Sequence, residues 1–198
     1  MAWENHAEIE DAHKLNGIKI SQAIYQQISK NNPNSWIKFD AKSGDNLDLE
    51  LGLPKLDSLL EFRPTIELIS PSNKSTELSS INVLNPKVFY EPFTQTNSWV
   101  LWKNTIPLSE SGTYYLVSSD PKNEFGKLWI AIGREESFGA SDLLNLPISI
   151  NDVKAFHAPN NQKSGSSKIL IISFLICLSL VLIIFRKKIV RIFYKQVK

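Results

Sequence analysis

The stretch from residue 47 to residue 53 constrains the fold most, because apolar and polar positions alternate along it. Leucine occupies every second position, and acids or glycine occupy the positions between: Leu47, Asp48, Leu49, Glu50, Leu51, Gly52, Leu53. Successive side chains of a β-strand point to opposite faces of its sheet. The pattern therefore predicts a strand whose leucine face is buried and whose acidic face meets solvent.

Five further runs are rich in β-branched, aromatic or alternating apolar residues, at 37–41, 65–69, 98–102, 113–117 and 127–132. Residues that favour turns separate them, at 42–46, 70–73, 110–112 and 120–123. No long amphipathic helix lies between these runs, which favours an antiparallel β-sandwich over alternating strands and helices. Two short helices are expected, near Ser21–Ile28 and Ala140–Leu146.

A second strong feature is the apolar run from Ile169 to Phe185, seventeen residues with no charge, proline or glycine. As a helix at about 1.5 Å per residue it would be roughly 25 Å long, close to the roughly 30 Å of a bilayer core. A buried core helix of this length normally carries a polar stripe, and this run has none. The run predicts a single membrane span, followed directly by Arg186, Lys187 and Lys188.

The charges that flank this run predict its orientation. Six basic groups and no acid lie in residues 169–198, and basic residues favour the cytoplasmic side. Residues 1–168 are then extracytoplasmic and the tail 186–198 is cytoplasmic. Residues 1–6 show neither the basic nor the apolar part of an export signal. An external domain therefore implies a signal that has been removed or that lies upstream of Met1. The alternative is a protein inserted by its C-terminal span, with the large domain in the cytosol.

Composition excludes several classes of function. Residues 1–168 hold 16 basic and 20 acidic groups, a balance that does not suit nucleic-acid binding. A single cysteine, Cys177, excludes an internal disulfide, and with only three histidines it also excludes a zinc module rich in Cys and His. The sequence contains no nucleophile elbow, zinc-protease motif, phosphate loop or dinucleotide fingerprint. We therefore expect no catalytic or cofactor-binding residues and no enzymatic activity.

The N-terminal segment contains a candidate metal site. Carboxylates on a short loop suit a hard cation such as Ca²⁺, and two histidines seven residues apart suit copper or zinc. The candidate ligands are His6, Glu8, Glu10, Asp11 and His13. A solvated acidic segment with a surface pair of histidines is the simpler interpretation.

Aromatic residues are dense between residues 89 and 102. Large flat side chains provide contact area at low entropic cost, so Tyr90, Phe93, Trp99 and Trp102 form a candidate contact surface. The alternative, which we favour, places most of them in the core, with one of Trp99 and Val100 facing inward.

Three strings resemble bacterial pre-peptidase C-terminal domains. They are the aromatic strand, turn and leucine strand at 36–51, the Pro-Thr-aliphatic run at 63–72, and Glu-Ser-Gly-Thr-Tyr-Tyr-Leu-Val at 110–117. The resemblance covers roughly residues 20–133. It implies a jelly-roll-like sandwich of secreted or surface proteins that serves binding or stability and is not itself catalytic.

The expected protein is mainly β, an antiparallel jelly-roll-like β-sandwich followed by a single C-terminal transmembrane helix. Its expected parts are a polar segment, the sandwich, a helical or irregular extension, a polar linker, the span and a basic tail, at 1–19, 20–133, 134–158, 159–168, 169–185 and 186–198. The expected function is a non-catalytic binding or assembly module, an accessory subunit of a membrane complex, whose partners are membrane lipid and another protein. The alternatives are a calcium- or copper-handling protein and a tail-anchored cytosolic interaction domain.

Overall fold

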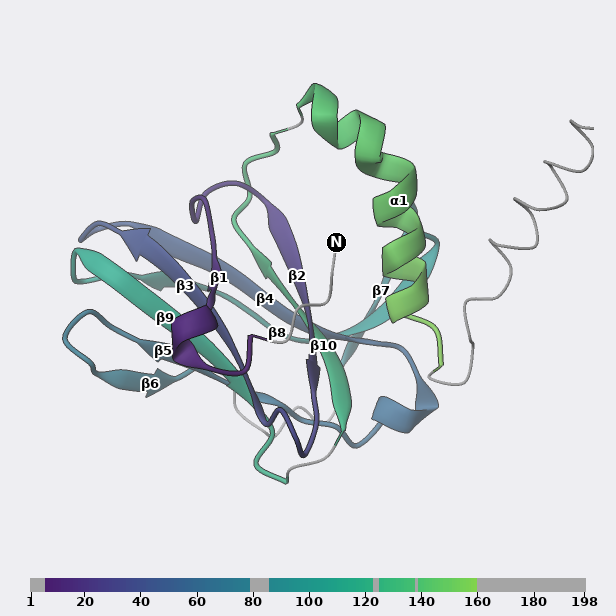
Figure 1. The fold of residues 1–198 in the computed structure, drawn as a ribbon, viewed down its shortest axis with the longest axis horizontal. Coiled ribbons are helices and arrows are strands. Elements are labelled where there is room, and N and C mark those ends of the chain that lie inside the picture. The colour runs from purple at the N-terminus through teal and green to yellow at the C-terminus, as the bar shows by residue number, and fades with distance from the viewer. Residues whose placement is uncertain (1–5, 79–85, 123–124, 138, 160–198) are drawn as a thin grey trace, which may run out of the picture. The chain divides into compact units, whose positions relative to one another are not determined.

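The computed structural model describes residues 6–78, 86–122, 125–137 and 139–159. These residues form two five-stranded sheets (Figure 1). The first has the order β1 (His13–Lys14), β3 (Asn34–Ala41), β9 (Gly112–Ser119), β5 (Thr65–Ile69) and β6 (Ser75–Glu77). The second has the order β2 (Gln22–Ile28), β10 (Gly126–Ile132), β4 (Asn46–Pro54), β8 (Thr96–Pro107) and β7 (Lys87–Glu91).

Neighbouring strands pair in antiparallel fashion, apart from the short parallel pair β1 and β3. Two 3₁₀ turns, η1 (Ile9–Asp11) and η2 (Asp57–Leu59), and one helix, α1 (Ala140–Phe156), complete the described elements. The prediction of a mainly β, two-sheet sandwich is confirmed. All six strand runs read from the sequence lie within strands of the structure.

The core lies between the two sheets and follows the predicted alternation. Every leucine of the 47–53 run is at most 2% exposed. From the other sheet, Ile37, Phe39, Ile66 and Leu116 are buried to the same degree. The central strands thus bury one face against the opposite sheet, and the acidic face of β4 points out of the sandwich. The edge strands β6 and β7 have no buried residue.

The predicted helix near Ser21–Ile28 is wrong, because this segment is strand β2. It pairs with β10 from Gln22 to Ile28, with Gln26 and Ile28 buried. The sequence QAIYQQI has no strict alternation, so its conformation is decided by the hydrogen bonds and packing that β10 offers. The second predicted helix is confirmed but longer, since α1 extends to Phe156.

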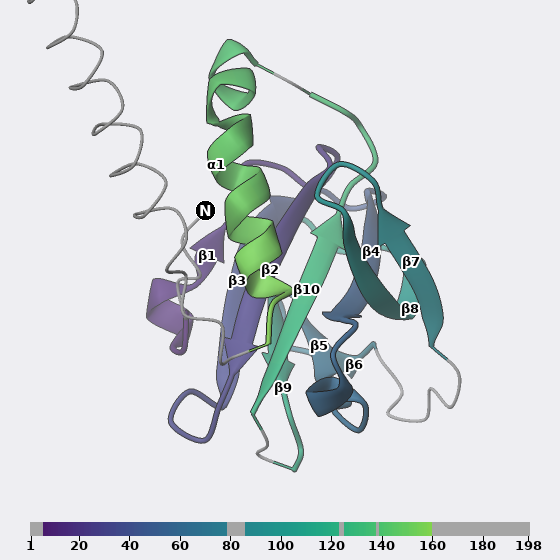
Figure 2. The same cartoon turned by 90° about the vertical axis from the view of Figure 1, so that its right-hand side faces the viewer.

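The C-terminal end of α1 packs on the outer face of the second sheet, in front of β2 and β10 (Figure 2). Phe156 is fully buried and meets the ring of Tyr25 edge-on at 5.0 Å between centroids. The ammonium of Lys127 on β10 donates to the carbonyls of Phe156 at 3.2 Å and Ala158 at 3.1 Å. Lys127 thus ties the last residue of α1 and the segment that follows it to β10.

Residues up to Ala158 form one compact unit. In the part of the chain that the structure describes, no helix has the length and apolarity to cross a membrane. The predicted span 169–185, with Ile169 and Phe185 at its ends, and the basic group Arg186, Lys187 and Lys188 lie outside the described residues.

Candidate binding cleft

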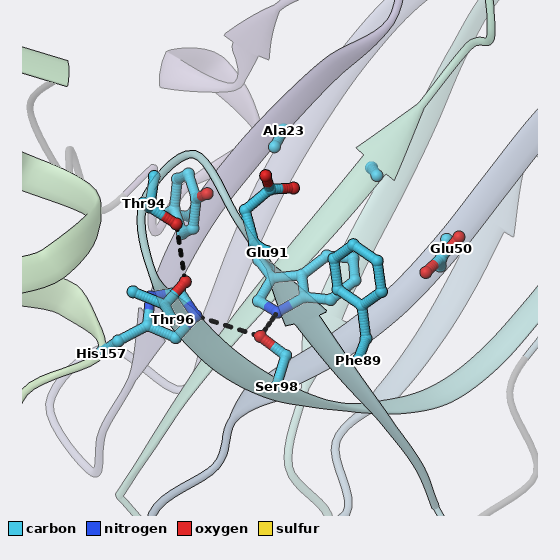
Figure 3. Close-up of a pocket in the computed structure, with 11 residues that line it drawn as sticks. Ala23, Glu50, Phe89, Glu91, Thr94, Thr96, Ser98 and His157 are labelled. Atoms are coloured by element: carbon cyan, nitrogen blue, oxygen red, sulfur yellow. Dashed lines mark hydrogen bonds between the residues drawn. The ribbon is translucent and has the colours of Figure 1, made fainter. Parts of the chain in front are cut away.

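A cleft of about 230 Å³ opens on the outer face of the second sheet, between β7 and the end of α1 (Figure 3). All five strands of the second sheet, the turn between β7 and β8, and the segment after α1 contribute to it. Its lining consists of Ala23, Tyr25, Glu50, Phe89, Glu91, Thr94, Thr96, Ser98, Trp129, Ala131 and His157. Aromatic rings, hydroxyl groups and carboxylates therefore meet in one hollow.

Small residues on the strands make room for the large ones. A Cβ atom at Gly52 would lie 2.1 Å from the indole of Trp129, so the ring lies directly over this glycine. The ladder between β4 and β8 is irregular at the same point, between Leu51 and Gly52. Ala131, two residues along β10 from Trp129, pairs with Ala23 on the neighbouring strand β2, and both small side chains line the cleft.

A chain of hydrogen bonds joins the sheet to the end of α1. The indole N–H of Trp129 donates to Oγ of Ser98 at 3.1 Å, and this Oγ lies 3.1 Å from Nε2 of His157. Nδ1 of His157 lies 2.9 Å from the carbonyl oxygen of Val153. A carbonyl can only accept, so Nδ1 carries the proton and Nε2 of the neutral ring accepts from Ser98.

Burial sets the protonation of this network. The pKa of His157 is lowered from 6.5, chiefly by burial and further by the charge of Lys127, against the opposing hydrogen bond to Val153. Burial also lowers the pKa of Lys127. His157 is therefore neutral at pH 7, as the hydrogen-bond chain requires.

The side of the cleft that faces β7 is lined by a carboxylate and by hydroxyl groups. Burial and the nearby carboxylate of Glu91 raise the pKa of Tyr25 to about 12. Glu91 accepts from the backbone N–H of Phe93 at 3.1 Å, and the hydroxyls of Thr94 and Thr96 bond to each other at 2.8 Å. Glu91 has no ion-pair partner among the described residues.

The second acid of the cleft is already neutralised. Glu50 lies 2.5 Å from the ammonium of Lys103, to which it is paired across β4 and β8. Glu91 is thus the acid with the greater capacity to attract a cation, and it lies beside the aromatic rings.

The structure separates the four aromatic residues of the predicted contact surface. Tyr90 is 53% and Phe93 68% exposed, whereas Trp99 is 8% exposed and belongs to the core. Trp102 packs against the same core. Between Trp99 and Val100 it is Trp99 that faces inward, so only Tyr90 and Phe93 are available to a partner.

The predicted metal ligands lie around η1. The rings of His6 and His13 are 5.3 Å apart between centroids, while Glu8 and Asp11 form a capping box around the turn. Within the described ranges no three or more His, Cys, Asp or Glu side chains are grouped so that they could hold a metal ion.

Sequence reasoning missed the residues that build the cleft. The sequence predicts a helix at Tyr25 and indicates for Trp129 only a place in a strand. His157 lies 59 residues from Ser98 in the sequence, so nothing local connects them. The one available signal was Gly52 within an otherwise leucine-rich strand, because a strand glycine often marks a close approach of another group.

The sequence matches no protein-family profile and no curated protein. Among solved structures, it is similar to the pre-peptidase C-terminal domain of collagenase from Bacillus anthracis, at 13% identity and a TM-score of 0.37 over 60% of this chain and 91% of that chain. It is also similar to PliG, a periplasmic inhibitor of g-type lysozyme. The Salmonella Typhimurium protein has 15% identity and a TM-score of 0.39, over 62% and 96% of the two chains. The Aeromonas hydrophila protein has 11% identity and a TM-score of 0.38, over 62% and 94%. Scores of this size assign the chain to no family.

Proposed function

We propose that this protein is a non-catalytic binding module whose cleft takes a basic side chain of a protein partner. The observation that carries the proposal is the carboxylate of Glu91 next to the aromatic lining of Tyr25, Phe89 and Trp129. An ammonium or guanidinium group gains both from a carboxylate and from the faces of aromatic rings.

The surroundings of the cleft support a protein partner over a small cation. Phe89 and Phe93 are 43% and 68% exposed at the β7 side, so apolar surface continues outward from the acidic site. A lysine or arginine brings an apolar stem and a neighbouring backbone that can cover such a surface. A free metal ion or small amine would leave it exposed to water.

A hydrolase is the competing function, because Ser98 and His157 form the hydroxyl and imidazole pair that nucleophilic catalysis uses. Two features favour a structural role for this pair. Ser98 is only 5% exposed, and its Oγ already accepts the indole N–H of Trp129. A fluorophosphonate probe is expected to leave Ser98 unlabelled, and labelling that disappears in Ser98→Ala would favour the hydrolase.

The cleft can be tested by NMR with the indole N–H signal of Trp129 as the reporter. N-acetyl-lysine methylamide is expected to shift this signal in a saturable way, and the uncharged norleucine analogue much less. Glu91→Gln should remove most of the lysine response, because the carboxylate is lost. Glu77→Gln, an exposed change on β6 in the other sheet, is the matched control. Equal responses to lysine and norleucine, or an unchanged response in Glu91→Gln, would refute the proposal.

We also propose that residues 169–185 anchor the domain, with residues 186–198 in the cytoplasm and the β-sandwich outside. The apolar run and its basic flank support this. So does the resemblance to jelly-roll-like pre-peptidase C-terminal domains of secreted proteins, since its three strings fall on β3 and β4, on β5, and on β9. The test is protease protection in sealed vesicles with tags at both ends. Cleavage of the N-terminal tag only from the cytosolic side would instead favour a tail-anchored protein.

A further inference from the structure

Strand β7 is the last strand of the second sheet and pairs with β8 on one side only, among the strands that the structure describes. Its three central residues, Val88, Phe89 and Tyr90, are 53%, 43% and 53% exposed. Proteins usually protect such an edge with a charge or proline inside the strand, because its free backbone groups can pair with another chain. In β7 the central residues are all apolar or aromatic, so this edge is open to pairing.

The sequence of β7 is complementary to itself when read in the opposite direction. The strand reads Lys-Val-Phe-Tyr-Glu, with a cation at one end and an anion at the other. If two copies pair in antiparallel fashion about Phe89, Lys87 of each lies opposite Glu91 of the other. Val88 then lies opposite Tyr90 of the second copy, and Phe89 opposite Phe89. Opposite charges and aromatic or β-branched residues directly across an antiparallel pair stabilise it.

We propose that the partner of the β7 edge is a second copy of this chain, joined by antiparallel β7 strands about a twofold axis at Phe89. The contact is isologous, so it closes after two copies and does not grow further. It makes one continuous sheet from the second sheets of the two copies. This inference goes beyond the cleft proposal and does not rest on it.

The flanking prolines limit the length of the pairing, and the charges select a single register. Pro86 and Pro92 flank the strand, and proline cannot donate a backbone hydrogen bond to a neighbouring strand. A shift of the centre to Val88 or Tyr90 sets Lys87 or Glu91 opposite an aromatic residue or a flanking position. Only the register centred on Phe89 places Lys87 of each copy opposite Glu91 of the other.

Five residues from each copy make a small interface, so the dimer is weak and its population depends on protein concentration.

Charge reversal tests the pairing directly. We would measure sedimentation velocity of the full chain in detergent micelles over a concentration series. Lys87→Glu places two acids opposite each other, and Glu91→Lys places two bases opposite each other. Each variant should dimerise at least about tenfold more weakly than the unmodified chain. The double variant, and an equal mixture of the two single variants, should regain association because every charge again faces its opposite.

The mixture is the decisive arm, since a variant that fails to fold is not repaired by mixing. The proposal is overturned if the unmodified chain does not associate, or if the mixture associates no more than its components. A second test fixes the register. With Cys177→Ser, a cysteine introduced by Phe89→Cys should form a dimer with a short bis-maleimide linker, and one introduced on β6 by Thr76→Cys should not. Lys87→Glu leaves every cleft-lining residue in place, so loss of the dimer and loss of lysine binding are distinguishable.

Discussion

His157 and Ser98 lie 59 residues apart in the sequence, yet their Nε2 and Oγ atoms are 3.1 Å apart. This contact, together with the buried ring of Phe156, holds the end of α1 against the outer face of the sheet. It also supplies one wall of the cleft. The wall is therefore built by an element that packs on the sandwich from outside and is not part of either sheet.

The first prediction concerns pH. The folded state lowers the pKa of His157 below 6.5, so it favours the neutral ring and binds fewer protons than the unfolded chain. This contribution to stability is fully present above pH 6.5, the pKa of the unfolded chain. It is lost as the pH falls from 6.5 through the lowered pKa of the folded state. The charged and titratable groups facing the ring are Lys127 and Tyr25. Burial lowers the pKa of Lys127 from 10.5 and raises that of Tyr25 to about 12, and the comparison with His157→Gln isolates the part of the response that belongs to His157.

Urea unfolding followed by near-ultraviolet circular dichroism at pH 7.5 and pH 5.5 measures this response. His157→Gln should lose less stability between the two pH values than the unmodified chain. An identical loss in both proteins would show that the folded state does not favour the neutral imidazole.

The second prediction concerns Lys127, whose ammonium bonds to the carbonyls of Phe156 and Ala158. Lys127→Met keeps the apolar stem but removes both hydrogen bonds. It should lower the free energy of unfolding by about 1 kcal/mol, because losing the bonds outweighs the relief of no longer burying a charge. Amide hydrogen exchange should become faster in the last turn of α1. Lys55→Met, at an exposed position, should change neither the free energy of unfolding nor the exchange rate of these amides. Unchanged protection of residues 153–158 in Lys127→Met would contradict the role given to the ammonium.

The third prediction concerns Gly52, over which the indole of Trp129 lies. Gly52→Ala forces the indole aside, which should cost about 1–3 kcal/mol of unfolding free energy and break the hydrogen bond to Ser98. In a Trp129→Leu background the same substitution should cost much less, because the collision partner is gone. A double-mutant cycle measures this coupling, and a cycle with no coupling energy would exclude the indole as the cause.

The fourth prediction concerns Ser118, which is fully buried opposite Ser35 across β3 and β9. Neither hydroxyl has a hydrogen-bond partner among the described residues. Ser118→Ala should therefore raise the free energy of unfolding by about 1 kcal/mol, since a buried hydroxyl without a partner is costly. The neighbouring Ser119→Ala should lower it, because Oγ of Ser119 bonds to Thr65 at 2.9 Å. The opposite order of the two variants would contradict this account.

The sandwich could be predicted from the sequence because its central strands carry their own signal. In β4 the leucines alternate with acids, and the structure buries those leucines as the period of two requires. Strand β2 carries no such alternation, and its conformation depends on β10, which lies about a hundred residues later in the chain. The sequence does not predict strand β7 as a separate element. An edge strand that is exposed along its length needs no alternation of apolar and polar residues, so it carries no strand signal.

The cleft could not be predicted from the sequence because its parts meet only in the folded chain. Phe89 and Glu91 come from an edge strand, Trp129 from a central strand and His157 from the segment after α1. The sequence marks Tyr90 and Phe93 beside it as candidate contact residues, but it favours a core position for most of this aromatic cluster, whereas both residues are exposed. It could not show that Trp99, in the same cluster, turns into the core, because one residue of register decides which face a strand side chain takes.

The last turn of α1 has a mechanical consequence. The chain continues from Ala158 directly into the segment that leads to residues 169–185, and Ala158 is one of the two carbonyls that Lys127 holds. The hydrogen bonds of Lys127 and His157 are the described side-chain hydrogen bonds that hold this end of the chain to the second sheet. If residues 169–185 anchor the domain as proposed, a pull on this anchor would act on the wall of the cleft before it acted on either sheet.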